Sequence, residues 1–196
     1  MTKTEVQKSL ALRISTITIL TAITTVFTLA VRIPVAPTRG YINLGDVAIY
    51  FSAFAFGPFT AFITGGLGTS LADILGGFAQ WAPITLLAHG FQGFVIGLIV
   101  GMAVQKREKL DRVEAADFLM GNFSWQVIVR LVLAFVGGTV VMAGGYLLAE
   151  TFIVGFGAAL VELPGNVLQN VAGIIGGVPL TIALKKAYPP IGGLRW

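Results

Sequence analysis

The chain has 196 residues, of which 56% are hydrophobic and only 11% are charged, whereas soluble domains carry about 25% charged residues. This composition excludes an ordinary soluble domain and predicts a single transmembrane domain over residues 1–196. The chain has no cysteine, which excludes disulfides, cysteine-based metal sites and a thiol nucleophile. Its net charge of +4 comes mostly from cations at the edges of apolar segments, so we expect contacts with lipid headgroups and none with nucleic acid.

Six apolar segments predict six transmembrane helices, because a bilayer core of about 30 Å is crossed by about 20 apolar residues. The first segment follows a polar N-terminal stretch and is unusually rich in threonine. Gly57-Pro58 separates the second segment from the third, because proline interrupts a helix. The predicted helices cover residues 12–31, 46–57, 59–77, 84–105, 120–148 and 159–184. The predicted fold class is therefore an all-α membrane protein.

Residues 32–46 form a connector, rich in proline and glycine, between the first two predicted helices. Proline favours extended backbone in the residue before it, so no helix is expected to continue through this stretch. Backbone that is neither helix nor sheet is tolerated near a bilayer only where protein covers it or water reaches it. We therefore expect an ordered outer loop, with Tyr41, Asn43 and Asp46 in a lid or at the rim of a pocket.

The distribution of positive charge predicts the orientation in the membrane. Six spans place both termini on one side, together with the densely charged loop at residues 105–112, while a short loop around Glu150 lies on the other side. Arg32 and Arg39 fall on that other side, and Arg130 lies within a span. The remaining ten of the 13 Lys and Arg residues fall on the side of the termini: Lys3, Lys8, Arg13, Lys106, Arg107, Lys109, Arg112, Lys185, Lys186 and Arg195. This bias predicts cytoplasmic N- and C-termini.

Polar side chains recur at helical spacing inside four of the predicted spans, where an ionisable group costs about 2.5–3.5 kcal/mol on insertion scales. Offsets of three, four and seven residues place the members of each set on one face of its helix. The sets are Thr69, Ser70 and Asp73; Thr85, His89 and Gln92; Gln126 and Arg130; and Glu162, Asn166 and Gln169. At a rise of about 1.5 Å per residue, four of these residues fall about 8–14 Å below the outer surface: Asp73, His89, Glu162 and Asn166. We therefore expect a cavity that opens outward beneath the connector.

Several of these residues have a second interpretation. Asp73 or Glu162 could neutralise Arg130 in a structural ion pair, and Arg130 could simply hold helices together. His89 could be a histidine of the bundle interior with satisfied hydrogen bonds. It is a poor metal candidate, because it is the only histidine in the sequence and a metal needs further ligands.

The chain lacks the motifs of several enzyme classes. It has no Gly-x-x-x-x-Gly-Lys-Ser/Thr loop, so it does not hydrolyse ATP by that route. Gly65-Gly-Leu-Gly68 does not have the spacing of a dinucleotide fingerprint, and there is no His-Glu-x-x-His. We expect no enzymatic activity and no cofactor bound by this chain. No inverted repeat is detectable between the two halves, which weakens the case for a self-sufficient secondary transporter.

Two motifs together carry a family resemblance: Pro37-Thr-Arg-Gly-Tyr-Ile-Asn-Leu-Gly-Asp46 and Glu162-Leu-Pro-Gly-Asn166-Val-Leu-Gln169. They resemble the S components of energy-coupling factor (ECF) vitamin transporters, and the resemblance covers essentially the whole chain. The chain is most similar to the subfamilies assigned to hydroxymethylpyrimidine or pyridoxine-like compounds. The resemblance implies a high-affinity vitamin-binding subunit in the plasma membrane of a prokaryote. It also implies two kinds of partner, a transmembrane coupling protein and two cytoplasmic ABC-type ATPases, which use the ATP.

The expected binding residues follow from the polar sets and the resemblance together. Rings at Tyr41 and Trp81 could stack on a flat heteroaromatic ligand, or they could be ordinary interface aromatics. The full expected set is Tyr41, Asn43, Asp46, Asp73, Trp81, His89, Gln92, Glu162 and Asn166. In this family the coupling protein meets small residues of the first helix. The nearest match here is Thr18 and Ala22, followed by Val26 instead of a small residue, and the expected interface is Thr18, Ala22 and Thr25.

Two hypotheses from other classes remain open. The chain could be an autonomous proton- or ion-coupled carrier of a small metabolite, with Asp73 or Glu162 as the proton site. It could also be an intramembrane enzyme with His89 and Glu162 as acid and base. Uptake by the chain alone in liposomes under a proton gradient would favour the carrier, and a chemically altered product would favour the enzyme.

Overall fold

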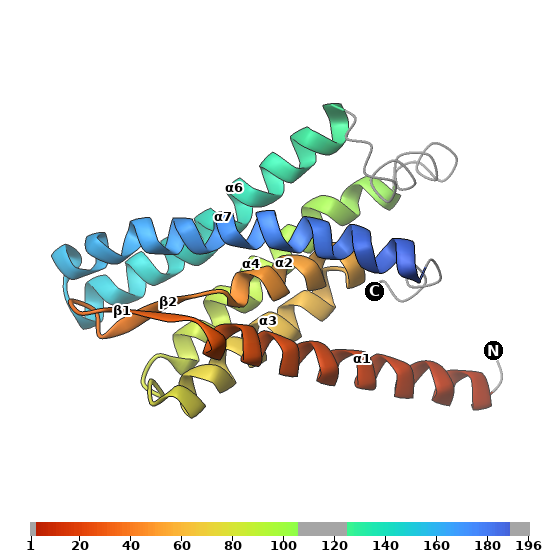
Figure 1. Ribbon diagram of the computed structural model, residues 1–196, viewed down its shortest axis with the longest axis horizontal. Helices are drawn as coiled ribbons and strands as arrows, with labels where there is room; N and C mark the ends of the chain where they lie inside the picture. Colours follow the sequence, from red (N-terminus) through yellow and green to blue (C-terminus); the bar gives the residue numbers. More distant parts are fainter. Residues whose placement is uncertain (1–2, 106–124, 189–196) are drawn as a thin grey trace.

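The computed structural model describes residues 3–105 and 125–188, which form six helices and one β-hairpin (Figure 1). The elements are α1 (Lys3–Ala30), β1 (Arg32–Val35), β2 (Gly40–Asn43), α2 (Gly45–Phe56), α3 (Pro58–Gly76), α4 (Ala82–Gln105), α6 (Trp125–Ile153) and α7 (Phe156–Ala187). The predicted charged loop, apart from its first residue, lies outside the described residues. The first five residues of the predicted fifth span, 120–124, lie outside them as well.

Five of these helices are long and apolar enough to cross a membrane, namely α1 from Leu10 onward, α3, α4, α6 and α7. The remaining helix, α2, has only 12 residues and is about 18 Å long at 1.5 Å per residue. This length is well short of a bilayer core of about 30 Å. The described chain is thus a multi-pass, all-α membrane protein with the expected six helices, but α2 by itself is too short for a span.

α2 is the buried centre of the helical bundle. Every residue of this helix except Phe51 is buried, and it packs against α1, α3, α4 and α7. Tyr50 and Phe54 are fully buried and join Ile96 of α4 and Ala134 of α6 in the main hydrophobic cluster. A helix that is apolar on all sides is stable only when other protein surrounds it, so the composition of α2 explains its place. The predicted break at Gly57-Pro58 is confirmed, because α2 ends and α3 begins there.

Glycines allow the long helices to approach α2 and one another closely. A Cβ atom added at either Gly173 or Gly177 of α7 would lie 2.6 Å from a side-chain atom of Tyr50. On α4, a Cβ at Gly93 would lie 2.7 Å from the backbone oxygen of Ala61 in α3. Small residues at such contacts let helix backbones come together and gain van der Waals packing. Gly144 of α6, by contrast, faces open space.

The connector between α1 and α2 is a β-hairpin, whereas the sequence was expected to give backbone that is neither helix nor sheet. β1 and β2 pair antiparallel, with Pro34 opposite Tyr41. Proline is tolerated here because both strands of a two-stranded sheet are edge strands. Arg39, in the turn, has a φ of 56° in the left-handed region. The prediction that no helix continues through this stretch is confirmed.

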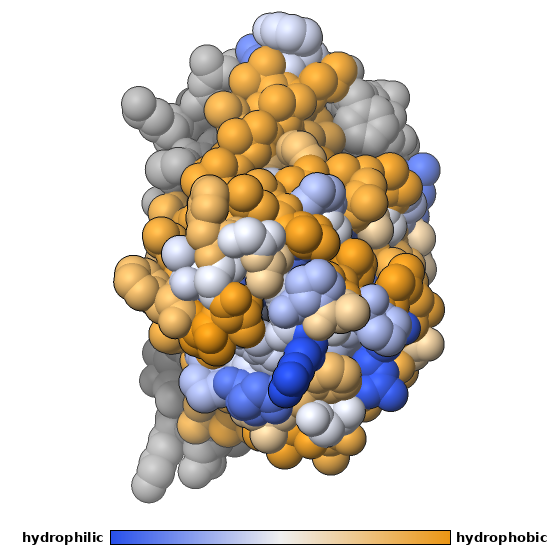
Figure 2. All heavy atoms as spheres, turned by 90° about the vertical axis from the view of Figure 1, so that its left-hand side faces the viewer, coloured by the Kyte–Doolittle hydropathy of each residue, from blue (hydrophilic) through white to orange (hydrophobic). Residues whose placement is uncertain are grey.

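The two ends of the molecule carry different elements. The N-terminal end of α1 and the C-terminal end of α7 lie at one end, on the right in Figure 1, and the hairpin lies at the other. Figure 2 looks onto the hairpin end, where hydrophilic residues gather between apolar ones.

One predicted helix boundary was wrong: Glu150 was expected in a loop, but it lies within α6 (Trp125–Ile153). The turn to α7 consists of Val154 and Gly155.

Candidate functional site

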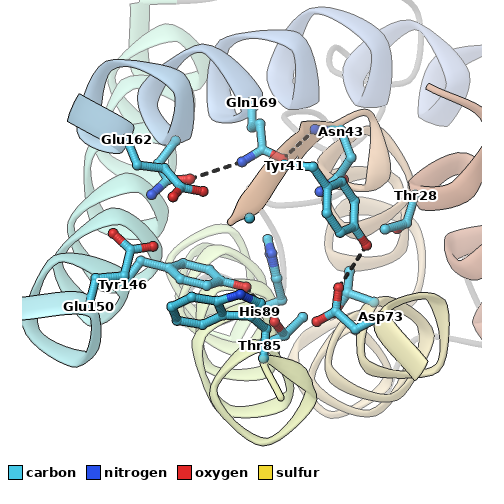
Figure 3. A pocket seen from close by; sticks show the side chains of 14 residues that line it. Thr28, Tyr41, Asn43, Asp73, Thr85, His89, Tyr146, Glu150, Glu162 and Gln169 are labelled. Atoms are coloured by element: carbon cyan, nitrogen blue, oxygen red, sulfur yellow. Dashed lines mark hydrogen bonds between the residues drawn. The ribbon is translucent and has the colours of Figure 1, made fainter. Parts of the chain in front are cut away.

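A pocket lies under β2, where all five long helices contribute polar side chains (Figure 3). Its lining consists of Thr28, Gly40, Tyr41, Asn43, Thr69, Asp73, Trp81, Thr85, His89, Tyr146, Glu150, Glu162, Asn166 and Gln169. The cavity between them has a volume of about 20 Å³, which is room for about one water molecule. A ring-sized ligand therefore requires some of the lining side chains to move outward.

The pocket brings together seven of the nine residues expected from the sequence: Tyr41, Asn43, Asp73, Trp81, His89, Glu162 and Asn166. The other two, Asp46 and Gln92, do not line it. Asp46 was expected in the lid, but it lies in the first turn of α2, has 0% exposure and sits behind His89. Gln92, one turn along α4 from His89, is also fully buried.

β2 covers the pocket because alternate residues of a strand point to the same side. Tyr41 and Asn43 are therefore both buried, while the residues of β1 are mostly exposed. The Tyr41 hydroxyl donates a hydrogen bond of 2.7 Å to Oδ1 of Asp73, and the Asn43 backbone N–H donates one of 2.8 Å to Oε1 of Gln169. These bonds tie the hairpin to α3 and α7. Burial and the bond to Asp73 raise the pKa of Tyr41, so its hydroxyl remains a donor at neutral pH.

Close contact between the hairpin and α7 explains two glycines near the site. A Cβ at Gly40 would lie 2.9 Å from Oε1 of Glu162, and a Cβ at Gly165 would collide with Cδ1 of Ile42. A side chain at either position would push β2 away from the helix. Gly40 therefore lets the backbone of β2 lie directly on the Glu162 carboxyl group.

His89 is held from behind by a buried hydrogen-bond network. Its Nδ1 lies 2.8 Å from Oε1 of Gln92 and 3.3 Å from Oδ1 of Asp46. The Gln92 amide nitrogen donates to Oδ2 of Asp46 at 3.1 Å and to Oδ1 of Asn170 at 2.8 Å. Since both neighbours of Nδ1 are acceptors, Nδ1 carries a hydrogen, which leaves Nε2 as the atom available to the pocket. The Tyr50 hydroxyl also donates to Oδ1 of Asn170, at 3.0 Å, so the network links α2, α4 and α7.

Three carboxyl side chains line the pocket without full pairing. Asp73, Glu150 and Glu162 are 4%, 1% and 5% exposed. Among the described residues, no hydrogen-bond partner contacts Oδ2 of Asp73, Oε2 of Glu150, Oε2 of Glu162 or Nε1 of Trp81. An unsatisfied buried polar group costs about 1–3 kcal/mol, and native proteins contain few of them. Four such atoms around one pocket make it a site where water or a polar ligand can bind.

Sequence reasoning missed Tyr146 and Glu150 as pocket residues. The Tyr146 and Thr85 hydroxyls lie 2.6 Å apart, and Glu150 lies beside Glu162, with which its charge interacts. The error came from ending the fifth predicted helix before Glu150. Had the helix been continued, the spacing of four residues would have placed Tyr146 and Glu150 on one face. Gln169, Thr69, Thr85 and Thr28 also line the pocket but were not in the expected binding set.

The alternative ion pairs with Arg130 do not form. Glu150 and Arg130 are 20 residues apart on α6, or about 30 Å along the helix axis. Because Glu150 shares the pocket with Asp73 and Glu162, both carboxyl groups lie beyond the reach of the Arg130 side chain.

The expected contact face on α1 is only partly exposed. Thr18 and Ala22 face outward, but Thr25 is 9% exposed and donates a 2.9 Å hydrogen bond to the backbone oxygen of Gly68 in α3. Thr25 therefore belongs to the α1–α3 contact. The outward face continues instead through Val26, which is 61% exposed.

Comparison with known proteins identifies the family. The family model of the ECF-type riboflavin transporter, S component, matches residues 9–186. A protein of Pyrococcus woesei described as "Uncharacterized protein in gap 3'region" is 34% identical over 167 residues, which cover 85% of this chain and 97% of the relative. The thiamine precursor transporter HmpT of Lactococcus lactis subsp. cremoris (strain MG1363) is 28% identical over 164 residues, covering 83% of this chain and 81% of HmpT.

These matches confirm the resemblance seen in the connector and α7 motifs. The names of the family model and of HmpT refer to different ligands, riboflavin and a thiamine precursor. What they share is transport of a vitamin or its precursor. The chain belongs to the family of ECF-type riboflavin transporter S components, the membrane subunits that bind the substrate of these transporters.

Proposed function

We propose that the chain binds a small heteroaromatic vitamin precursor, of the hydroxymethylpyrimidine or pyridoxine type, and delivers it for ATP-driven import by an ECF complex. One observation carries this proposal: polar side chains from five helices and β2 converge on one pocket, and four buried polar atoms there have no partner among the described residues. The similarity to HmpT supports the precursor class.

The proposed binding mode uses ring faces and hydrogen bonds. Rings at Tyr41, Trp81 and Tyr146 border the pocket and can stack on a flat ligand. Glu162 and Asn166 lie on one face of α7, four residues apart, and can bond ring nitrogens or hydroxyl groups. A site built in this way rejects analogues that lack those groups, because its own buried polar atoms would be left unpaired.

Access to the pocket is proposed from the outer side of a prokaryotic plasma membrane, with both termini in the cytoplasm. The hairpin lies at the end of the molecule opposite the N-terminal end of α1 and the C-terminal end of α7. Lys185 and Lys186 lie in the last turn of α7, and Arg13 lies near the start of the apolar part of α1, which begins at Leu10. Cations at that end fit the positive-inside rule, so the hairpin is the proposed outer lid.

The proposed energy source lies on partner chains. A transmembrane coupling protein is proposed to dock on the outward face of α1, where Thr18, Ala22 and Val26 follow one another at four-residue spacing and are all exposed. Small side chains on such a stripe let a partner helix approach closely. Two cytoplasmic ABC-type ATPases would complete the complex, since this sequence has no phosphate-binding loop.

A second candidate function, a proton-coupled carrier, is favoured by one specific observation. His89 and Asp46 form a buried pair, with Nδ1 and Oδ1 3.3 Å apart, and buried ionisable pairs in membrane helices often relay protons. Reconstitution of the chain alone in liposomes separates the candidates. Uptake of hydroxymethylpyrimidine driven by a proton gradient, with no ATPase present, would support the carrier and contradict the ECF proposal.

The direct test of the proposed function has two parts. Mass spectrometry of small molecules that co-purify with the chain should find a single-ring heteroaromatic compound, and calorimetric titration should show one-to-one binding. Cells that express the chain together with a coupling protein and two ATPases should accumulate the same compound, and cells that express the chain alone should not. Tight binding of riboflavin with no binding of hydroxymethylpyrimidine or pyridoxine would overturn the proposed ligand class.

A further inference from the structure

The pocket gathers three acidic side chains at close range. Asp73, Glu150 and Glu162 come from three different helices, α3, α6 and α7, and each is at least 95% buried. Among the 14 lining residues, all within the described part of the chain, none is Lys or Arg. His89 carries at most one positive charge, and its Nδ1 also faces Asp46, a fourth carboxyl group behind the pocket. The carboxyl groups therefore outnumber the basic groups in and behind the pocket wall.

The unpartnered atoms also define a pattern of hydrogen bonds. Three of the four are carboxyl oxygens, one on each of the three acidic side chains, and these can accept hydrogen bonds. The fourth is Nε1 of Trp81, a residue 7% exposed, and this atom can only donate. A ligand that satisfies all four must present several donors and one acceptor. It must also leave few acceptors facing the carboxyl groups.

The aromatic residues of the lining suit the same kind of ligand. Tyr41, Trp81 and Tyr146 border the pocket together with the carboxyl groups. The faces of aromatic rings attract cations, most strongly where water is excluded. The carboxyl groups and the ring faces thus both favour a positively charged ligand.

We infer that the ligand is a nitrogen base bound in its protonated, cationic form, with N–H donors directed at Asp73 and at the Glu150–Glu162 pair. This inference rests on the proposed function and assigns its substrate to a charge class. A cation supplies counter-charge to these carboxyl groups, and burying paired charges costs far less than burying unpaired ones. An anionic or phosphorylated compound would place its own negative charge against these buried acidic side chains and is disfavoured by the same reasoning.

Matched pairs of ligands test this on the full wild-type chain in detergent. Pyridoxamine and pyridoxine differ by an aminomethyl group in place of a hydroxymethyl group, and hydroxymethylpyrimidine has a corresponding aminomethyl analogue. In calorimetric titrations at pH 7 and low salt, we expect the aminomethyl member of at least one pair to bind about tenfold more tightly or better. Equal affinity within both pairs, or tighter binding of the hydroxymethyl members, would overturn the inference and leave the proposed function standing. Binding of no member of either pair would contradict both.

Substitutions in the acidic pair test whether Glu150 and Glu162 cause the preference for the aminomethyl ligand. Glu150→Gln and Glu162→Gln keep the side-chain shape and each remove one ionisable carboxyl group. We expect either change to reduce the preference for the aminomethyl member about tenfold, with a smaller effect on the hydroxymethyl member. Glu5→Gln, near the start of α1 and away from the hairpin end, is the matched control and should leave the preference unchanged. A preference that survives both pocket substitutions would overturn the assignment to this acidic pair, and the wild-type titrations remain decisive if a variant fails to fold.

Discussion

The Tyr41 hydroxyl donates a 2.7 Å hydrogen bond to Oδ1 of Asp73 and thereby joins the hairpin to α3 across the pocket. The Tyr41 ring also packs on Phe78, with ring centroids 4.7 Å apart. Because the cavity beneath has a volume of only about 20 Å³, a ligand must displace this residue or its neighbours to enter. Tyr41 is therefore the side chain at which closure of the site is easiest to probe.

Tyr41→Phe should speed ligand release about tenfold, because the hairpin loses the hydrogen bond that ties it to Oδ1 of Asp73 and opens more readily. The ring and its contact with Phe78 are kept, so we expect a faster dissociation rate rather than a misfolded chain. Stopped-flow measurement of ligand release checks this. Tyr188→Phe, at an exposed position past the end of α7, is the control. Equal release rates in wild type and Tyr41→Phe would show that the bond does not close the site.

Stability should fall at high pH through Tyr41. Burial and the Asp73 hydrogen bond raise the pKa of Tyr41 above its ordinary value of about 10. The unfolded chain therefore loses this proton first, so ionisation favours unfolding as the pH rises above about 10. Below that pH the residue contributes no pH dependence. Thermal unfolding in detergent between pH 8 and 11 should show a smaller loss of stability in Tyr41→Phe than in wild type, and identical losses would contradict the prediction.

Gly177→Ala should destabilise the fold by about 1–3 kcal/mol, the usual effect of overpacking a close contact. The added Cβ would lie 2.6 Å from Cβ of Tyr50 and 2.9 Å from the backbone nitrogen of Phe51 in α2. Gly144→Ala is the matched control, because its Cβ meets nothing within 4 Å. Alanine in an open helical position stabilises by about 0.5–1 kcal/mol relative to glycine. Thermal unfolding should therefore move in opposite directions for the two variants, and a shared direction would refute the close packing of α2 on α7.

Thr18→Leu combined with Ala22→Leu should leave ligand binding unchanged and abolish ATP-driven uptake. Both residues face outward on α1, so larger side chains there obstruct a partner helix without entering the pocket. Co-purification with the coupling protein checks whether the complex is lost. Val140→Leu, at a site on α6 that is 66% exposed, is the control. Normal uptake by the α1 double variant would show that the coupling protein docks elsewhere.

Helix positions were predictable because apolar length and glycine–proline breaks set them locally. For α2, α3, α4 and α7, the predicted ends lie within three residues of the observed ones. The first helix starts earlier than expected, at Lys3, because the polar N-terminal stretch also forms helix. Apolarity alone marks where a helix crosses the lipid and gives no signal for its polar continuation.

The convergence of polar side chains was also visible in the sequence, because residues four apart share a helix face. Asp73, His89 and Glu162 meet in one pocket as that spacing suggested. The place of Asp46 behind His89 was not visible, because it depends on how deeply the short α2 is buried among its neighbours. The pairing of β1 with β2 was missed for a similar reason: four-residue strands with prolines carry little sequence signal, and their contact with α7 at Gly165 is long-range.

The most direct measurement is calorimetric titration of the purified wild-type chain, Glu162→Gln and Asn166→Ala with hydroxymethylpyrimidine. Both side chains line the pocket from α7, and removing a partner of a buried ligand group costs about 1–3 kcal/mol. We expect one-to-one binding by the wild type and about 5- to 150-fold weaker binding by each variant. Affinities in both variants equal to that of the wild type would show that the ligand does not bind in this pocket.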